Sequence, residues 1–110
     1  MVEYKSIELD AIFSSLSDPT RRDMLRRLRP HDYSVGELAR HYDLTFAAIS
    51  KHLQVLERAR LVRKHRRGRE QMVELSPAGL QNADEYLQLY RAVWEGRMDS
   101  LAVHLKSKNT

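Results

Sequence analysis

The sequence predicts a mainly α-helical domain with one small β-hairpin and a long helix at its C-terminal end. Three observations lead to this fold class. Apolar residues recur at helical spacing in several segments that begin with capping residues. Residues 61–75 instead have the pattern of two strands around a glycine turn. Beyond residue 77, apolar residues recur every seven positions.

The composition fits a single small domain and excludes several classes of protein. The chain has 110 residues, of which 42% are hydrophobic and 31% charged, as is typical of one soluble domain. It has no cysteine, so disulfides, thiolate zinc sites and cysteine nucleophiles are excluded. Residues 1–9 lack the apolar core of a signal peptide or a membrane span. We therefore expect a cytoplasmic protein with no membrane partner.

Two helices are expected in the first 28 residues. The first ends near Ser17, and its apolar stripe has helical spacing: Leu9, Ile12, Phe13 and Leu16. Asp18 and then Pro19 are typical of an N-cap and a first helical position, which opens a second helix through Leu28. Arg21 aligns with the apolar face of that helix, which favours a structural ion pair. The outward arginines are weaker phosphate candidates: Arg22, Arg26 and Arg29.

Two short helices follow and predict a helix-turn-helix motif. Ser34 and Glu37 have the spacing of a capping box, in which we expect each side chain to satisfy an amide of the first turn. The helix that they open, residues 34–42, has an apolar face: Val35, Leu38, Ala39 and Tyr42. Thr45 caps the next helix, residues 45–59, whose inner face is equally regular: Ala48, Ile49, Leu53 and Leu56. In this motif the second helix enters the major groove of DNA.

The outward face of the helix at 45–59 is small and polar at the end that is expected to meet DNA. Ser50 and Gln54 offer hydrogen bonds to base edges or phosphates, and Lys51 offers a phosphate or guanine contact. Phe46 fits a contact with a thymine methyl group and equally a hydrophobic position at the edge of the core. The candidate DNA-binding residues of this helix are Thr45, Phe46, Ala47, Ser50, Lys51, Gln54 and Arg58.

A basic hairpin follows the helix pair. Strands at 61–66 and 71–75 flank a turn that contains Gly68. Residues 58–69 contain seven cations and no acid: Arg58, Arg60, Arg63, Lys64, Arg66, Arg67 and Arg69. A protruding basic hairpin suits a wing that follows a DNA backbone or minor groove. We place its DNA contacts first at the tip, on Arg66, Arg67 and Arg69.

The charge distribution favours a polyanion-binding middle segment. Residues 1–20 have one lysine and four acids, residues 21–69 have fourteen lysines and arginines and five acids, and residues 70–110 have four and six. The net charges are therefore −3, +9 and −2, which sum to +4. A basic segment between acidic ends is typical of nucleic-acid binding. A solvated charged surface, or a face that docks an acidic protein, is the alternative.

The last helix is expected to form a dimer surface. Ser76 and Pro77 cap a segment of about thirty residues, or about 45 Å, that runs to Lys106. Its apolar residues recur at intervals of seven: Leu80, Leu87, Trp94 and Leu101. So small a domain cannot bury this face alone, although a helix folded back on its own core is the alternative. The predicted dimer interface is Leu9, Ile12, Phe13, Leu80, Leu87, Tyr90, Trp94 and Leu101.

Three stretches together resemble the ArsR family of bacterial winged helix-turn-helix regulators. They are residues 16–25 (LSDPTRRDML), residues 48–57 (AISKHLQVLE) and Leu61-Val62 before the basic hairpin. The resemblance covers nearly the whole chain. It implies a homodimeric transcriptional repressor that is joined through its first and last helices, binds an inverted-repeat operator in double-stranded DNA, and is released by a signal.

The metal sites that the resemblance implies are not matched by this sequence. The cysteine pair of metal-binding relatives would fall at about Ser34 and Gly36. The ligand pattern of their last helix also fails, because Tyr86 follows two residues after Asp84 and His104 is isolated. We expect no metal and no cofactor. A metal-responsive repressor with a non-standard site is the alternative.

Two further functions, effector binding and catalysis, would require other features of the sequence. An unknown small-molecule effector would fit the aromatic cluster of the last helix, although packing against a partner explains it better: Tyr86, Tyr90, Val93, Trp94 and Met98. We expect no enzyme, because no nucleophile with a base and no glycine-rich phosphate loop is present. The expected organisation is one domain with three parts: a dimerisation helix at 1–17, a DNA-binding core at 18–75 with its wing at 61–75, and a dimerisation helix at 76–110.

Overall fold

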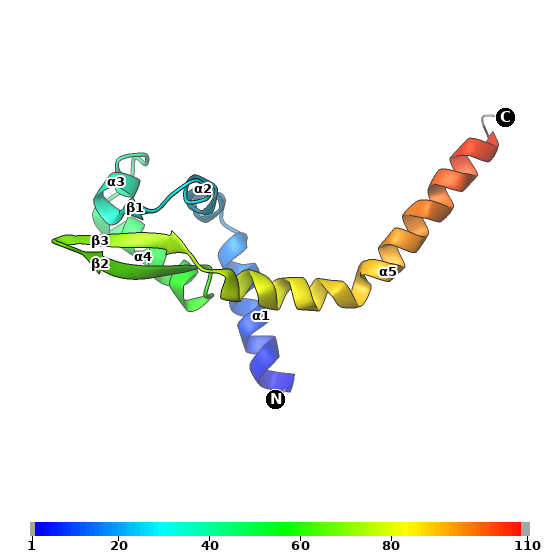
Figure 1. Ribbon diagram of the computed structural model, residues 1–110, viewed down its shortest axis with the longest axis horizontal. Helices are drawn as coiled ribbons and strands as arrows, with labels where there is room; N and C mark the ends of the chain where they lie inside the picture. The colour runs from blue at the N-terminus through cyan, green and yellow to red at the C-terminus, as the bar shows by residue number, and fades with distance from the viewer. Residues whose placement is uncertain (1, 109–110) are drawn as a thin grey trace.

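The structure confirms the predicted fold class. The computed structural model describes residues 2–108, with side chains for residues 8–97, 101–102 and 104–105. In this part of the chain the elements are α1 (Val2–Leu16), α2 (Pro19–Arg27), β1 (Tyr33–Ser34), α3 (Val35–Ala39), α4 (Phe46–Arg58), β2 (Val62–Arg67), β3 (Glu70–Leu75) and α5 (Pro77–Lys108). The strands form an antiparallel sheet in the order β1-β3-β2. Figure 1 shows α1 to α4 and the sheet gathered together, with α5 leading away from them.

One hydrophobic core holds the helices α1 to α4 against one face of the sheet. Its most deeply buried residues come from all of these elements: Ile12, Met24, Leu28, Leu38, Ile49, Leu53, Leu56, Leu61, Val62 and Val73. Burial of one such side chain contributes about 1.5–3 kcal/mol. The core therefore supplies the main force that positions α4 and the hairpin relative to each other.

Ile12 corrects one sequence prediction. Its side chain is only 1% exposed and belongs to this core, so its assignment to the dimer surface was wrong. An amphipathic stripe has the same spacing whether it faces the core of its own chain or a partner. Spacing alone therefore did not separate Ile12 from its neighbour Phe13, which is exposed.

Three predicted N-caps are confirmed. The side chains of Asp18, Ser34 and Thr45 accept hydrogen bonds from the backbone amides three residues later, at 3.0, 3.0 and 3.1 Å. In the described residues the capping box at Ser34 is one-sided, because the Glu37 carboxylate makes no return bond. The caps fix where α2, α3 and α4 begin.

The helix α3 is shorter than predicted. It ends at Ala39, whereas the apolar spacing extended it to Tyr42. The amides of His41 and Tyr42 bond carbonyls three residues back, at 3.2 and 3.1 Å, which is the tighter geometry of a closing turn. Tyr42 keeps helical spacing from Leu38 and packs half-buried against the core as predicted, and its hydroxyl also donates to Asp23.

The end of α4 is joined closely to the start of α5. Arg60 has φ 59°, and the amides of Arg60 and Leu61 bond the carbonyls of Glu57 and Leu56 at 3.0 Å each, which is a Schellman motif. The Gly79 amide then donates to the Arg60 carbonyl at 2.8 Å. A Cβ at Gly79 would lie 2.4 Å from the Ala59 carbonyl oxygen, so only glycine fits this junction.

The sheet contains one strand that the sequence did not reveal. β1 has two residues, Tyr33 and Ser34, which pair with Val73 and Met72 of β3. A strand of two residues has too little alternation to predict. The hairpin strands are each one residue longer at the turn than predicted, because Arg67 pairs with Glu70. Gly68, at φ 63°, supplies the turn conformation that other residues avoid.

The helix α5 projects from the body of the chain (Figure 1). The radius of gyration is 18.7 Å, against about 13 Å for a compact domain of this length. Ala83 reaches the core, and every described side chain from Asp84 onward is exposed. The alternative of a helix folded back on its own core is therefore wrong for this part of α5.

Candidate nucleic-acid interface

The helix α4 has one buried face and one polar face. Ile49, Leu53 and Leu56 are fully buried, and they hold the helix against the core. The opposite face carries the predicted DNA-binding residues, all of them exposed except Ser50, which is half-buried: Thr45, Phe46, Ala47, Ser50, Lys51, Gln54 and Arg58. The structure therefore leaves a side-chain array free on one side of a rigidly held helix.

The first turn of α4 leads this array. The Thr45 hydroxyl accepts from the Ala48 amide, and its own hydrogen stays available to a phosphate oxygen. Phe46 is 65% exposed, so its alternative role at the edge of the core is wrong. Ala47 beside it is small and exposed, which lets a base edge or backbone approach closely.

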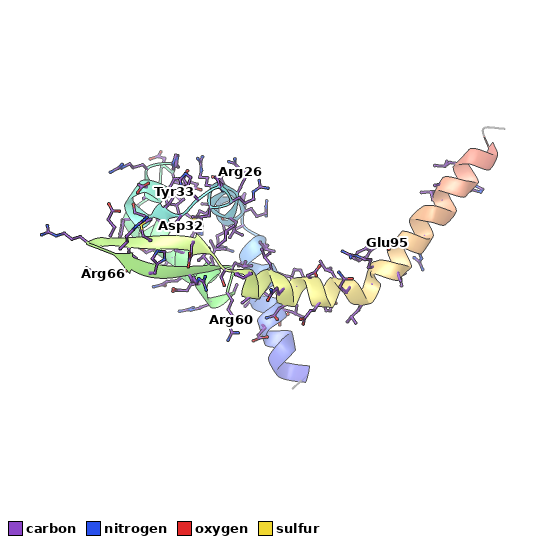
Figure 2. The ribbon with its side chains drawn as sticks, viewed as in Figure 1. Arg26, Asp32, Tyr33, Arg60, Arg66 and Glu95 are labelled. Atoms are coloured by element: carbon purple, nitrogen blue, oxygen red, sulfur yellow. The ribbon has the colours of Figure 1, made fainter. Side chains whose placement is uncertain are left out.

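The cations of the hairpin form two groups. We call Arg63 and Lys64 the wing root, and Arg66, Arg67 and Arg69 the wing tip. At the root, Arg63 Nε donates to Glu74 Oε1 at 2.5 Å, and Lys64 Nζ lies 3.9 Å from a carboxylate oxygen of Glu57. At the tip, no carboxylate of the described residues lies within ion-pair distance of the three arginines. Figure 2 places Arg66 toward the free end of the hairpin. The tip is thus the part of the wing whose charge is free for a polyanion.

Arg21 fastens α4 to the end of α1. Its Nε donates to the Ser15 carbonyl at 2.7 Å and its Nη2 donates to the Ser14 carbonyl at 3.1 Å. Its Nη1 lies 3.3 Å from His52 Nδ1 on α4. The predicted ion pair was wrong, because the partners of Arg21 are carbonyls at a helix C-terminus and an imidazole. A cation is favourable at that end of a helix, a contact that the spacing of α2 alone did not show.

A second polar cluster joins α2 to the end of α3. Asp23 accepts from the Tyr42 hydroxyl at 2.7 Å and from Arg27 Nε at 2.8 Å, and it also pairs with Arg26. The Tyr42 bond, followed by Arg26, holds the pKa of Asp23 far below its ordinary value of 3.8. Burial, with the Asp23 carboxylate beside it, raises the pKa of Tyr42 to about 12. This cluster fixes the first helix of the helix-turn-helix motif.

The same cluster bears on the weaker phosphate candidates of α2. Arg26 is paired with Asp23, and Arg22 Nη1 donates to the Leu16 carbonyl at 2.8 Å. Both guanidinium groups therefore have partners within the protein. Arg29 is exposed.

A groove lies between α1 and α5, near the predicted aromatic cluster. Its volume is about 300 Å³, and it is lined by Glu8, Leu9, Asn82, Glu85, Tyr86 and Leu89. Tyr86 stacks edge-on against Phe13, with ring centroids 6.1 Å apart. Of the residues proposed for an organic effector, Tyr86 alone lines this groove, and the side chain of Met98 lies outside the described residues. Leu80 lines a different groove with Leu25 and Leu75.

Potential metal ligands gather at one place in the described part of the chain, on the sheet: Asp32, His65 and Glu74. This group differs from both metal-site patterns of the metal-binding relatives, which use a cysteine pair or the last helix. No helix among the described residues is long and apolar enough to cross a membrane.

Comparison with known proteins decides the family. The sequence profile of the bacterial regulatory proteins of the arsR family matches residues 18–64, from the cap of α2 into the wing. The transcriptional repressor SdpR of Bacillus subtilis is 32% identical over 79 residues, which are 72% of this chain and 88% of SdpR. The chain belongs to the ArsR family. It is thus a transcriptional regulator with a DNA-binding winged helix-turn-helix, and its relatives are regulators rather than enzymes.

Solved structures agree with this membership. An ArsR-like transcriptional regulator from Rhodococcus sp. RHA1 superimposes with a TM-score of 0.72 at 32% identity, over 92% of this chain and 93% of that one. A homodimeric winged helix-turn-helix DNA-binding domain from Mycobacterium bovis, solved by NMR, shares the fold with a TM-score of 0.60 at 18% identity, over 84% of this chain and 82% of that one.

Proposed function

We propose that this ArsR-family regulator is a homodimeric repressor that places α4 of each protomer in the major groove of an inverted-repeat operator. The exposed polar face of α4 carries this proposal, because a helix held by three fully buried residues presents a free array of hydrogen-bonding and basic side chains. Ser50, Lys51 and Gln54 would read base edges. Thr45 would contact a phosphate.

The wing tip would bind the DNA flanking each half-site. Arg66, Arg67 and Arg69 lie in the segment with a net charge of +9, and their guanidinium groups suit phosphates or a narrow minor groove. Because cations that neutralise phosphates release counterions, affinity should fall steeply with salt. The paired cations of the wing root should contribute less to this salt dependence of DNA affinity.

The dimer would form through α1 and α5. Exposed apolar side chains collect there: Leu80, Tyr86, Leu87, Leu89, Tyr90, Val93, Trp94, Leu101 and Leu105 on α5, with Phe13 on α1. A patch this extended favours association. The homodimeric state named for the Mycobacterium bovis domain supports a homodimer, and the name of SdpR supports repression. A two-fold dimer requires an operator whose half-sites repeat in inverted order.

A gel shift tests the DNA-binding proposal. Purified protein is titrated against the DNA upstream of its own gene, with nonspecific competitor and a series of salt concentrations. We expect a sequence-specific shift whose log affinity falls linearly with log salt. Changing Arg67 and Arg69 together to Ala should reduce that slope by about 1.8, since each phosphate contact contributes about 0.9.

Matched variants separate charge from recognition. Changing Arg91 and Arg97 on α5 to Ala removes the same charge at positions away from the proposed DNA-binding face. This control should leave the slope of log affinity against log salt unchanged. Gln54→Ala should weaken specific binding more than nonspecific binding. The proposal fails if no shift occurs at low salt, which would favour a basic face that docks an acidic protein partner.

A further inference from the structure

The outer face of the sheet brings together three side chains whose chemical types can coordinate a metal ion. Asp32 directly precedes β1, His65 lies in β2 and Glu74 lies in β3. One ligand atom from each side chain lies within 4.8 Å of the other two. Asp32 is marked on the β1 side of the sheet in Figure 2.

The strand register explains why these residues converge. Tyr33 pairs with Val73, so Asp32, one residue earlier, falls beside Glu74, one residue later. On the other side of β3, Arg63 pairs directly with Glu74, and His65 follows two residues after Arg63 on the same face. The backbone of three paired strands thus sets the positions of all three ligands.

The charges at this cluster favour a cation. The two carboxylates carry a charge of −2, and the Arg63 guanidinium on Glu74 offsets one of these two negative charges. Arg63 Nε now bonds Glu74 Oε1 at 2.5 Å, and His65 Nδ1 lies 3.9 Å from the same oxygen. The Asp32 carboxylate makes no hydrogen bond or ion pair with any residue that the structure describes. His31 Nδ1 lies 2.7 Å from the Asp32 backbone carbonyl and so steadies the loop without using the carboxylate.

We propose that Asp32, His65 and Glu74 bind a divalent first-row transition-metal ion at the base of the wing. One imidazole with two carboxylates suits zinc, manganese, iron, cobalt or nickel, whereas magnesium and calcium prefer oxygen ligands alone. Ligand distances of about 2.0–2.2 Å place donor atoms about 3–3.5 Å apart, so the side chains need to close by about 1–2 Å. Water would complete the coordination.

Such an ion would join β1 to both strands of the wing. Ser34, which caps α3, is two residues from Asp32, and the tip residues Arg66 and Arg67 follow directly after His65. The ion would therefore tie the helix-turn-helix motif to the wing. This site goes beyond the proposed repressor function and does not depend on it.

Metal titration of the intact protein tests the site. Chelator-treated protein is titrated with zinc chloride by calorimetry and then with cobalt, whose absorption spectrum reports its ligands. We expect one ion per protomer and a cobalt spectrum that changes in His65→Gln. Loss of a ligand should weaken zinc binding by more than about 10–100-fold, the effect of removing an outer-shell partner.

Matched variants give the contradicting outcomes. His104→Gln and Glu95→Gln change an exposed imidazole and an exposed carboxylate on α5, and both should bind zinc like the wild type. The proposal is overturned if the wild type shows no saturable binding, or if His65→Gln and His104→Gln weaken it equally. Circular dichroism checks folding, and Asp32→Asn, in a loop, repeats the test if a strand variant unfolds.

Arg63→Gln sharpens the result. Because the Arg63 guanidinium occupies Glu74 Oε1, its removal should strengthen zinc binding severalfold. Weaker binding in this variant would contradict the site. Neither titration contains DNA, so a failed metal test leaves the gel-shift result standing, and a failed gel shift leaves the metal site standing.

Discussion

The DNA-binding core and the far part of α5 differ in how their apolar residues are covered. In the core, Leu38, Ile49 and Leu53 are fully buried within one chain. On α5, Leu89 is 73% exposed and Leu87 is 42% exposed. The core is therefore covered within one chain, whereas the apolar face of α5 is exposed in one chain and would be covered by a partner in the proposed dimer. Apolar stripes of similar spacing are thus buried in one region and exposed in the other, and variants of the two regions and of their junction are expected to behave differently.

The largest effect is expected from a change in the core. Leu53→Ala should lower the free energy of unfolding by about 2–5 kcal/mol, because it leaves a cavity beneath α4. Urea unfolding measures this loss, which should not depend on protein concentration. In the control, Leu89→Ala, any loss should shrink as the protein is diluted, since it acts through association. If the stability losses of the two variants depended equally on protein concentration, the distinction between the core and α5 would fail.

The junction between the regions gives the next effect. Gly79→Ala should destabilise the fold by about 1–3 kcal/mol, because its Cβ would meet the Ala59 and Arg60 carbonyl oxygens at 2.4 and 2.7 Å. Thermal unfolding measures it. Gly36→Ala is the matched control, because the nearest atom to its Cβ is 4.0 Å away. If Gly79→Ala were as stable as Gly36→Ala, the start of α5 would not lie as close to the Ala59 and Arg60 carbonyl oxygens as the structure places it.

The cluster around Asp23 predicts a pH dependence of the core. A carboxylate whose pKa is lowered by folding stabilises the protein above its ordinary pKa of 3.8, and that contribution is lost as the pH falls through the folded-state value. Asp23→Asn should cost about 1–2 kcal/mol at neutral pH and flatten the loss of stability in acid. Urea unfolding from neutral pH to acid measures both. Asp43→Asn, at an exposed position, should change neither the stability at neutral pH nor its loss in acid. If Asp23→Asn lost as much stability in acid as the wild type, Asp23 would not be the source of the pH dependence.

The smallest expected effect is an increase in the free energy of unfolding. Arg60 holds a positive φ at the end of α4, where glycine is the usual residue. Arg60→Gly should therefore stabilise the protein by about 0.5–1 kcal/mol, even though it removes an exposed contact with Glu8 at 4.0 Å. Arg60→Ala loses the same side chain and keeps the unfavourable φ, so it should give no such gain in thermal unfolding. Equal stability of the two variants would contradict this account.

The sequence predicted the elements that have a period or a cap. Asp18, Ser34 and Thr45 each mark the start of a helix, and the glycine turn marks the hairpin. β1 was not predicted, because a strand of two residues is too short to show an alternating pattern. Ile12 was assigned to the dimer surface wrongly, because the spacing of an apolar stripe does not show whether its own chain or a partner buries it. At the candidate site, the exposed face of α4 followed from periodicity, whereas the contacts of Arg21 and the convergence at Asp32 depend on tertiary packing that no local pattern encodes.

Sedimentation equilibrium of the intact protein without DNA tests the central claim, that the core is complete in one chain and α5 needs a partner. We predict a dimer at micromolar concentration for the wild type. Leu87→Asp should give a monomer with unchanged helical circular dichroism, because it places a charge on the apolar face of α5 and leaves the core intact. A wild-type monomer, or a Leu87→Asp protein that unfolds while dilute wild-type monomer stays folded, would contradict the account.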